Sequence, residues 1–330
     1  METLEGAELC FPQLLNTSCR KPKPPDSETL ILYILMSLIA LLTVALNLLV
    51  IISISHFRQL HTTTNLLLLS LAVSDLLVGL LLMPGHILFT GACWFLGDLL
   101  CALYYVVDFI ITIASIGNMV LISVDRYVAI CDPLCYPTKV TQRRVKICVC
   151  LCWICSAVYS CLILSDSLRH PGRSKSCYGE CVIVLNNLAG AVDLFMSFLG
   201  PITVIIVLYM RVFVVAVSQA RAMRSQIVSA TLQPSGTGTV KKSELKAART
   251  LFVVIVVFVI CLFPYFYPSL TGQDTLISAS SLAFDIWLFY FNSCLNPVIY
   301  AFFYPWFRKS MKLVVRLQIL QPDSCEANIL

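Results

Sequence analysis

Long hydrophobic blocks alternate with short polar stretches along this chain. Seven blocks are long enough to cross a membrane as α-helices, since the hydrocarbon core requires about 20 apolar residues and offers no water to satisfy an open backbone. They cover roughly residues 30–54, 65–86, 98–122, 146–165, 185–213, 250–270 and 279–303. The pattern therefore predicts an all-α fold, a bundle of seven transmembrane helices.

Composition agrees with a polytopic membrane protein, because 58% of the 330 residues are hydrophobic and only 12% are charged. Residues 1–29 contain no apolar run and carry five acidic residues, so we expect a segment without a cleavable signal peptide, followed by a first helix that acts as its own insertion signal. The pattern therefore divides the chain into an N-terminal segment, 1–29, and a seven-helix domain, 30–303. One more helix, 304–317, and a tail, 318–330, follow.

Lysine and arginine set the expected orientation. With seven spans the chain ends lie on opposite sides, and an external N-terminus leaves only six of the 23 basic residues outside. These are Arg20, Lys21, Lys23, Arg169, Arg173 and Lys175. This is the positive-inside bias, so we expect a multi-pass plasma-membrane protein with an extracellular N-terminus. The net charge of +5 then reflects topology, and no nucleic-acid partner is expected, because the basic residues flank spans.

Residues 304–317 follow the seventh span with a different pattern. Pro305 stands at the first turn and basic residues alternate with apolar ones, which is typical of an amphipathic helix on the inner membrane surface. Membrane lipid is therefore an expected partner. Cys325 in the tail fits either a palmitoylated or an unmodified cysteine.

Sixteen cysteines resemble a disulfide framework until they are placed on the spans. Six fall on the external side and can oxidise: Cys10, Cys19, Cys93, Cys101, Cys177 and Cys181. The others fall within the spans or on the internal side, where small packing residues or reduced thiols are expected. Asn16 begins an external Asn-Thr-Ser sequon, consistent with glycosylation.

Two aspartates interrupt apolar spans, Asp108 in the third and Asp193 in the fifth. A charged side chain at the centre of a membrane helix costs about 2.5–3.5 kcal/mol on insertion scales, so it normally faces the protein interior and has a function. Two carboxylates in one cavity are suited to binding cationic nitrogens. The alternatives are a structural Asp108 bonded to a neighbouring tyrosine and a hydrated Asp193 at the membrane boundary.

The third span carries three features on one face. Asp108 and Arg126 are separated by 18 residues, which is five helical turns and about 27 Å. Cys101 precedes Asp108 by about two turns on nearly the same face. We therefore expect one helix to present a disulfide cysteine, an anion and an internal cation along a single inward-facing stripe.

Motifs in six spans resemble those of rhodopsin-like G-protein-coupled receptors. They are Leu71-Ala72-Val73-Ser74-Asp75, Asp125-Arg126-Tyr127, Trp153, Pro201, Cys261-Leu262-Phe263-Pro264 and Asn296-Pro297-Val298-Ile299-Tyr300, in chain order from the second span to the seventh. Within that class, the stretches 292–297 and 304–309 and the external Cys177-Tyr178-Gly179-Glu180-Cys181 resemble the trace amine-associated receptors. The likeness covers about residues 10–316.

This resemblance implies a receptor for small amines. Asp108 would bind a protonated amine, and a second carboxylate at Asp193 resembles the fish members of the family that take diamines; with Asp193 idle, the ligand would be a monoamine. For His86, packing between helices is a better interpretation than a place in the pocket. Trp287 is consistent with either role. The implied pocket walls are aromatic, which favours cation–π contact with an ammonium group: Tyr265, Phe266, Trp287 and Tyr290.

The resemblance implies two disulfides and a polar cluster. Cys101 would pair with Cys181, and Cys177 with Cys19 or, alternatively, with Cys10. The cluster fits a sodium and water site, a hydrogen-bond network between helices, or both. Its members are Asn47, Asp75, Ser293 and Asn296. Apart from this sodium ion, no cofactor is expected.

A heterotrimeric G protein would bind at the internal end. Arg126, flanked by Tyr127, would pair with Asp125 and Glu244 in the inactive state, and activation would break this pairing and turn the sixth helix outward. The residues expected to move or bend with it are Tyr209, Asn296, Pro297 and Tyr300. Leu262 replaces the tryptophan usual in this family, so Phe258 and Ile116 are expected to carry more of the coupling.

The expected function is therefore that of an amine receptor and not of an enzyme. The resemblance implies a G protein of the stimulatory or olfactory type and expression in sensory neurons. A transporter of organic cations would need an internal repeat and broken helices, and neither is visible in the sequence. Four scattered histidines supply no catalytic or metal-binding constellation.

Overall fold

The structure is a computed structural model that describes residues 8–14, 17–21, 27–229, 237–271, 279–321 and 324–329. Within these ranges it describes only the backbone of residues 28–29, 89–90, 216, 219–229, 237–251, 269, 271 and 279–283. The described chain is helical and contains no strand, only two isolated β-bridges, Leu9 with Arg20 and Ser18 with Tyr178. The predicted all-α class is confirmed.

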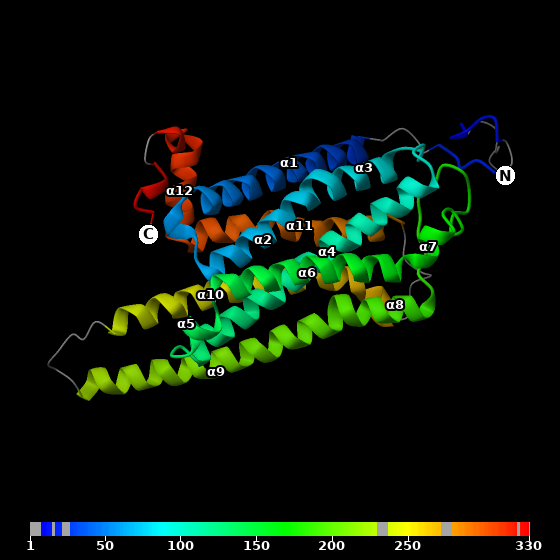
Figure 1. The fold of residues 1–330 in the computed structure, drawn as a ribbon. Helices are drawn as coiled ribbons and strands as arrows, with labels where there is room; N and C mark the ends of the chain where they lie inside the picture. The colour runs from blue at the N-terminus through cyan, green and yellow to red at the C-terminus, as the bar shows by residue number, and fades with distance from the viewer. Residues whose placement is uncertain are drawn as a thin grey trace.

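Seven long helical segments run side by side through the molecule (Figure 1). Their bounds are α1 Ser27–His56; α2 Thr63–Leu77, continued by η2 Val78–Leu82 and α3 Met83–Gly91; α4 Asp98–Cys131; α6 Gln142–Ile163; α8 Asn187–Leu194, continued by η3 Phe195–Leu199 and α9 Gly200–Ser229; α10 Thr237–Thr271; and α11 Ala279–Phe303. Each overlaps one predicted span, and the third, fifth and sixth segments are longer than predicted; the seven-helix bundle is confirmed. Among the described residues, six of these segments meet the length and hydropathy of a membrane span, and α10 contributes a shorter apolar stretch, Phe252–Pro268.

Short helices mark the two ends of the bundle. We call the end that holds the N-terminal segment 8–21 and α7 Ser165–Arg169 the disulfide end, and the opposite one the tail end (Figure 1). The tail end carries η1 Arg58–Leu60, α5 Tyr136–Lys139, α12 Pro305–Val315, η4 Gln318–Leu320 and η5 Ser324–Glu326.

Three disulfides give the disulfide end its name. They join Cys101 to Cys181, Cys19 to Cys177, and Cys10 to Cys93. The first two are the pairs that the resemblance implied, with Cys19 rather than Cys10 on Cys177. The third was not predicted, although both of its cysteines belong to the external set. A backbone hydrogen bond from Cys19 to Tyr178 holds the N-terminal segment against the loop 177–181, and one from Trp94 to Gly179 joins the turn between α3 and α4 to the same loop, both at 2.8 Å.

The π turn η3 interrupts the fifth segment just ahead of Pro201. Proline has no N–H to donate to the carbonyl four residues earlier, which here belongs to Ser197, and its ring crowds that carbonyl. A π turn is a common local answer to such crowding, often at functional sites. It places Asp193 in the last turn of α8 and Ser197 inside η3, where the Ser197 hydroxyl reaches the Asp193 carboxylate.

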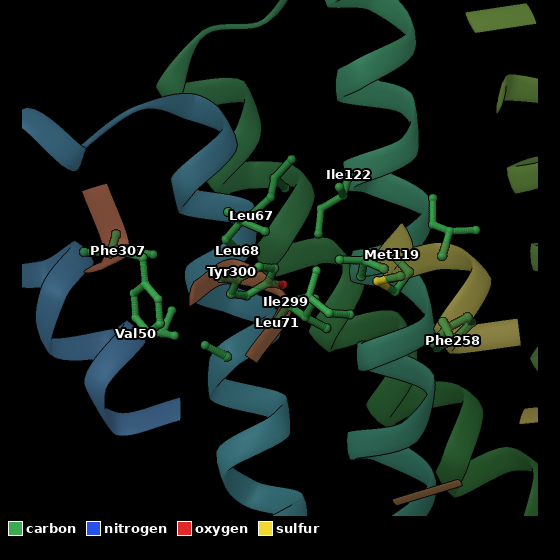
Figure 2. Close-up of a cluster of buried hydrophobic side chains, with 14 of the residues drawn as sticks. Val50, Leu67, Leu68, Leu71, Met119, Ile122, Phe258, Ile299, Tyr300 and Phe307 are labelled. Carbon is green, nitrogen blue, oxygen red and sulfur yellow. The ribbon is translucent and has the colours of Figure 1, made fainter. Parts of the chain in front are cut away.

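The largest cluster of buried hydrophobic side chains lies in the interior of the bundle (Figure 2). Side chains from α1, α2, α4, α10 and α11 meet there, and Tyr300 and Phe258 are almost fully buried. The helix α12 adds Trp306 and Phe307 to the cluster and turns basic residues to its other face, as an amphipathic helix should. Arg308 donates to the carbonyls of Ala301 and Phe302 and so satisfies the end of α11.

Gly117 lies where α4 passes close to α6, and it yields a prediction about packing. A methyl group there would come within 2.5 Å of the Cys152 Sγ. We expect Gly117→Ala to lower the free energy of unfolding by about 1–3 kcal/mol, the usual cost of overpacking, despite the higher helix propensity of alanine. Thermal unfolding of the purified protein in detergent measures the change.

Two variants control this experiment. Gly190→Ala adds the same methyl group in a helix where no atom lies within 4 Å, so it should not lower stability. Cys152→Ala in the Gly117→Ala background should recover the lost stability. The packing explanation is wrong if the double variant melts no higher than Gly117→Ala alone.

Candidate functional site

A cavity of about 230 Å³ lies between the helices in the half of the bundle nearer the disulfide end. Its walls come from α3, α4, α8, η3, α10 and α11. They include both intramembrane acids, Asp108 and Asp193, and three of the four predicted aromatic residues, Tyr265, Phe266 and Tyr290. The two acids thus face the same space from separate helices, as the sequence predicted.

Asp108 is near two hydroxyl groups, that of Tyr290 on α11 and that of Thr112 on its own helix. The Tyr290 hydroxyl in α11 donates to Asp108 Oδ1 at 3.3 Å, which is long for a bond between oxygens. The carboxylate therefore keeps most of its capacity to accept hydrogen bonds from a ligand. The alternative interpretation was a purely structural Asp108 bonded to a tyrosine. The bond to Tyr290 agrees with it, but Asp108 also lines the cavity and can therefore contact a ligand.

Asp193 is held more firmly. Its Oδ1 accepts from the Tyr159 hydroxyl of α6 at 2.9 Å and from the Ser197 hydroxyl of η3 at 2.6 Å. The side chain is partly buried and lines the cavity. The alternative of a hydrated residue at the membrane boundary does not describe this position, because two protein donors and the cavity surround the carboxylate.

Aromatic rings form much of the cavity wall between the two acids. Tyr265 lies edge-on to Phe266, with ring centroids 5.0 Å apart, and Phe289 lies 5.3 Å from Tyr265 and 5.7 Å from Tyr290. Phe266 also stacks on Phe198 at 4.8 Å. Ring faces attract cations and their apolar surface suits a methylene chain, so the wall fits an alkyl ammonium ligand.

The structure reverses the predicted roles of Trp287 and His86. Trp287 was predicted to line the pocket, and His86 to pack between helices. Trp287 is buried among Ala40, Met83 and Ile111, one layer behind the cavity, and does not line it within the described structure. His86 does line the cavity, and its ring meets Trp287 edge-on at 5.8 Å. The physical reason is helix rotation: in α11 the cavity side is taken by Ile286, Phe289 and Tyr290, which leaves Trp287 packed against α1, η2 and α3.

Several cavity residues were not predicted. Helix geometry offered a signal for most of them, because positions three to five residues from each acid share its face. Those on α4 are Tyr104, Tyr105, Phe109, Thr112 and Ile113; Ser197 follows Asp193 by four; Phe289 adjoins Tyr290. Tyr159 contacts Asp193 from α6, and nothing in the sequence brought these two helices together.

The Cys101–Cys181 disulfide lies above the cavity at the disulfide end. The Tyr105 hydroxyl, in the cavity wall, donates to the Cys181 carbonyl at 3.4 Å. Lys175 of the same loop forms a 2.6 Å ion pair with Asp98 at the start of α4. The loop is therefore fixed to α4 by a covalent bond and an ion pair.

At the tail end, Arg126 is engaged with its own neighbours. It forms a buried ion pair with Asp125 at 2.6 Å and donates to the Thr64 hydroxyl of α2. Tyr136 of α5 donates to the other Asp125 oxygen at 2.8 Å, and burial raises the pKa of this tyrosine, so it stays a donor at neutral pH. The predicted Asp125 pairing is present; Glu244, the other predicted partner, lies outside the described side chains.

The predicted switch residues lie around this ion pair and in the hydrophobic cluster. Tyr209 and Tyr300 are buried in the cluster, and neither hydroxyl has a hydrogen-bond partner within the described structure. Tyr127 packs on the Ile130 and Val212 pair between α4 and α9, and Pro297 interrupts α11. The cluster also contains Leu262, Phe258 and Ile116 together, so Leu262 fills a packed position next to the two residues expected to carry more of the coupling.

The polar cluster lies in the bundle interior between α1, α2 and α11. Asn296 donates to Asp75 Oδ2 at 2.8 Å, and Asn47 donates to the Ser293 carbonyl at 3.0 Å. The amide oxygens of Asn47 and Asn296 and the Oδ1 of Asp75 are buried without a protein partner in the described part of the chain. Buried polar atoms normally have partners, and unpartnered oxygens are what a hard cation or an ordered water binds.

Comparison with known proteins gives this arrangement a family context. Residues 46–300 match the family model "7 transmembrane receptor (rhodopsin family)". The chain is 37% identical to trace amine-associated receptor 13c of Danio rerio, over 98% of its own length and 97% of the relative. It is 38% identical to trace amine-associated receptor 8a of Rattus norvegicus, over 96% and 95% of the two chains. Trace amine-associated receptor 5 of the rat is similar at 37%, over 98% and 96%.

The positions of Phe289 and Trp287 predict opposite outcomes for two substitutions. Phe289→Leu removes a ring from the cavity wall and should weaken binding of an alkyl ammonium ligand by about 3- to 30-fold, which corresponds to about 0.5–2 kcal/mol of cation–π energy. Trp287→Phe should lower thermal stability through lost packing and change the affinity by less than about twofold. Direct binding assays and thermal unfolding on both variants separate the two effects. A larger affinity loss for Trp287→Phe than for Phe289→Leu would show that the wall is assigned to the wrong face of α11.

Proposed function

The chain belongs to the trace amine-associated receptors, within the rhodopsin family of seven-transmembrane receptors, and from this premise we propose that it binds small diamines between Asp108 and Asp193. Membership makes it an amine-sensing, G-protein-coupled membrane receptor and not an enzyme. The proposal concerns which amine it takes, where it acts and which G protein it activates.

One observation carries the diamine proposal: both carboxylates line a single cavity. Two negative charges in a space of low dielectric repel each other and are costly to leave unpaired. A ligand with one ammonium group would pair with one of them, whereas a ligand with two would neutralise both. The apolar rings between the acids suit the methylene chain of such a ligand.

The size of the cavity agrees with a small ligand. Pockets for drug-sized molecules have volumes of about 300–1,000 Å³, and this one is smaller, at about 230 Å³. A monoamine receptor that leaves Asp193 unused is the competing proposal within the family. Such a receptor would leave the partly buried Asp193 carboxylate without a cationic partner. No observation favours this competing proposal. An organic-cation transporter has no support among relatives that are all receptors.

We further propose that the disulfide end is extracellular and that the receptor resides in the plasma membrane of sensory neurons. Disulfides form in oxidising compartments, and all three bonds lie at this end. Asn16 would then be an external glycosylation site; it lies outside the described residues. An olfactory role follows from the family resemblance.

The tail end would receive the G protein, which we propose to be of the stimulatory or olfactory type. The ion pair of Arg126 with Asp125, supported by Thr64 and Tyr136, would keep Arg126 withdrawn in the resting state. Breaking it would free Arg126 for the partner, and Tyr209 and Tyr300, whose buried hydroxyls lack partners in the described structure, would gain polar contacts by moving toward it. Membrane lipid would contact the basic face of α12.

A sodium ion is a further proposal for the polar cluster. The residues fit it, because Asn47, Asp75 and Asn296 each present a buried oxygen without a protein partner in the described structure and sodium is a hard cation that prefers oxygen ligands. Asp75 would hold the ion and Asn296 would orient Asp75 through their hydrogen bond. The bound ion would neutralise a buried charge between α2 and α11.

The diamine proposal predicts different effects for Asp108→Asn and Asp193→Asn. Cells expressing the receptor are treated with α,ω-diamines and with monoamines of the same chain length, and cyclic AMP is recorded. Asp108→Asn should weaken responses to both classes. Asp193→Asn should raise the half-maximal concentration of diamines by about 30-fold or more, since removing one partner of a desolvated charge pair costs about 2–5 kcal/mol, and change that of monoamines less than about threefold.

Asp166→Asn is the matched control, because Asp166 is an exposed acid at the disulfide end, 3.6 Å from Arg173 and outside the cavity. Surface labelling corrects for expression. If both cavity variants respond to diamines as the wild type does, the two-anchor proposal is wrong. If Asp193→Asn affects diamines and monoamines equally, the monoamine alternative is preferred. A wild type that binds amines without raising cyclic AMP would contradict only the stimulatory coupling.

A further inference from the structure

The two acids of the cavity are held in different ways. Asp108 accepts a long hydrogen bond from Tyr290 at 3.3 Å and interacts with the Thr112 hydroxyl of its own helix. Asp193 accepts two short ones on the same oxygen, Oδ1, from Tyr159 at 2.9 Å and Ser197 at 2.6 Å. No hydrogen bond to Asp193 Oδ2 is present in the described structure. The second anchor is therefore fixed on one side and open on the other.

The two donors come from different elements, Tyr159 from α6 and Ser197 from η3. A carboxylate with one oxygen fixed from two elements cannot easily rotate, so its other oxygen stays in one place for a ligand. Each hydroxyl has only one hydrogen to donate, and both hydrogens are used on Oδ1. Charge-assisted hydrogen bonds of this kind are stronger than those between neutral groups, which supports a defined geometry before any ligand binds.

We propose that Tyr159 and Ser197 are positioning residues that make this side of the cavity selective for a cation. The inference rests on the proposed diamine function and adds to it the source of the selectivity. Tyr159 is not a cavity-lining residue in the described structure, so it acts through Asp193 and not on the ligand. Ser197 lines the cavity, but its hydrogen is committed to Asp193.

This commitment has a consequence for ligand class. A free serine hydroxyl in the wall could donate to a hydroxyl oxygen on a ligand. Here the Ser197 hydrogen already points to Asp193 Oδ1, and the open Asp193 Oδ2 can only accept. The wall presented to the far end of a ligand therefore favours an ammonium donor, and a monoamine whose far end is apolar would leave Oδ2 unpaired, at the cost of burying an unsatisfied charge.

The test is the effect of Tyr159→Phe, which removes one oxygen and keeps the ring. Affinity is measured directly, as binding of α,ω-diamines and of monoamines of equal chain length to membranes from expressing cells, so the result does not depend on the G protein. We expect the dissociation constant for diamines to rise about five- to tenfold, as for the loss of a hydrogen bond to a charged group that keeps a second donor. The constant for monoamines should change less than twofold.

Ser160→Ala is the matched control. Ser160 is the next residue of α6, is fully buried and donates within the helix to the Ser156 carbonyl at 2.7 Å. The Ser160→Ala variant removes a hydroxyl that does not contact Asp193. The ratio of diamine to monoamine affinity should therefore stay at the wild-type value. Ser197→Ala gives an independent test from η3 and should shift the ratio in the same direction as Tyr159→Phe; it also carries the test if Tyr159→Phe does not reach the surface.

A double variant separates this inference from the proposed function. In the Asp193→Asn background, Tyr159→Phe should cause no further loss that is specific to diamines, because the group it positions is gone. If Asp193→Asn itself leaves diamine affinity unchanged, the proposed function fails. If Asp193→Asn weakens diamines but Tyr159→Phe shifts both ligand classes equally, or shifts diamines just as much without Asp193, the positioning role is overturned while the diamine function stands.

Discussion

The structure depends on the cost of placing two carboxylates inside a membrane-spanning bundle. Each is expensive to insert and more expensive to leave without partners. The protein meets this cost with a cavity and a few hydroxyl donors, and it provides no lysine or arginine among the described cavity residues. Asp108 and Asp193 are thus left short of positive charge. A cationic ligand supplies the positive charge that the cavity walls lack.

The fold holds this arrangement in place through rigid parts on either side of the cavity. The disulfide between Cys101 and Cys181 fixes a loop over α4, and the π turn η3 brings Ser197 to Asp193. The hydrophobic cluster that contains Phe258 and Tyr300 also includes Phe266 of the cavity wall. A ligand that pulls α4 and α8 toward it would act on helical segments that extend into this cluster. Signalling to the tail end then requires that the helices can pack in two ways, one without and one with the ligand.

Much of this could be predicted from the sequence, because hydropathy and charge act over short distances along the chain. The spans, the inward face of Asp108 and the amphipathic α12 follow from helix periodicity. What failed depends on the rotation and packing of helices, which periodicity does not specify. Trp287 and Phe289 are two residues apart, and a rotation of α11 decides which reaches the cavity. The Cys10–Cys93 bond and the contact of Tyr159 with Asp193 join segments far apart in sequence, and no local signal identified either.

The central claim is that one diamine spans the two acids, and an experimental structure of the receptor with a bound α,ω-diamine tests it most directly. The account predicts one terminal nitrogen within hydrogen-bond distance of Asp108 and the other within hydrogen-bond distance of Asp193 Oδ2, with Tyr159 and Ser197 still bound to Oδ1. A ligand whose second nitrogen points to the disulfide end, with Asp193 contacting only protein or water, would contradict it.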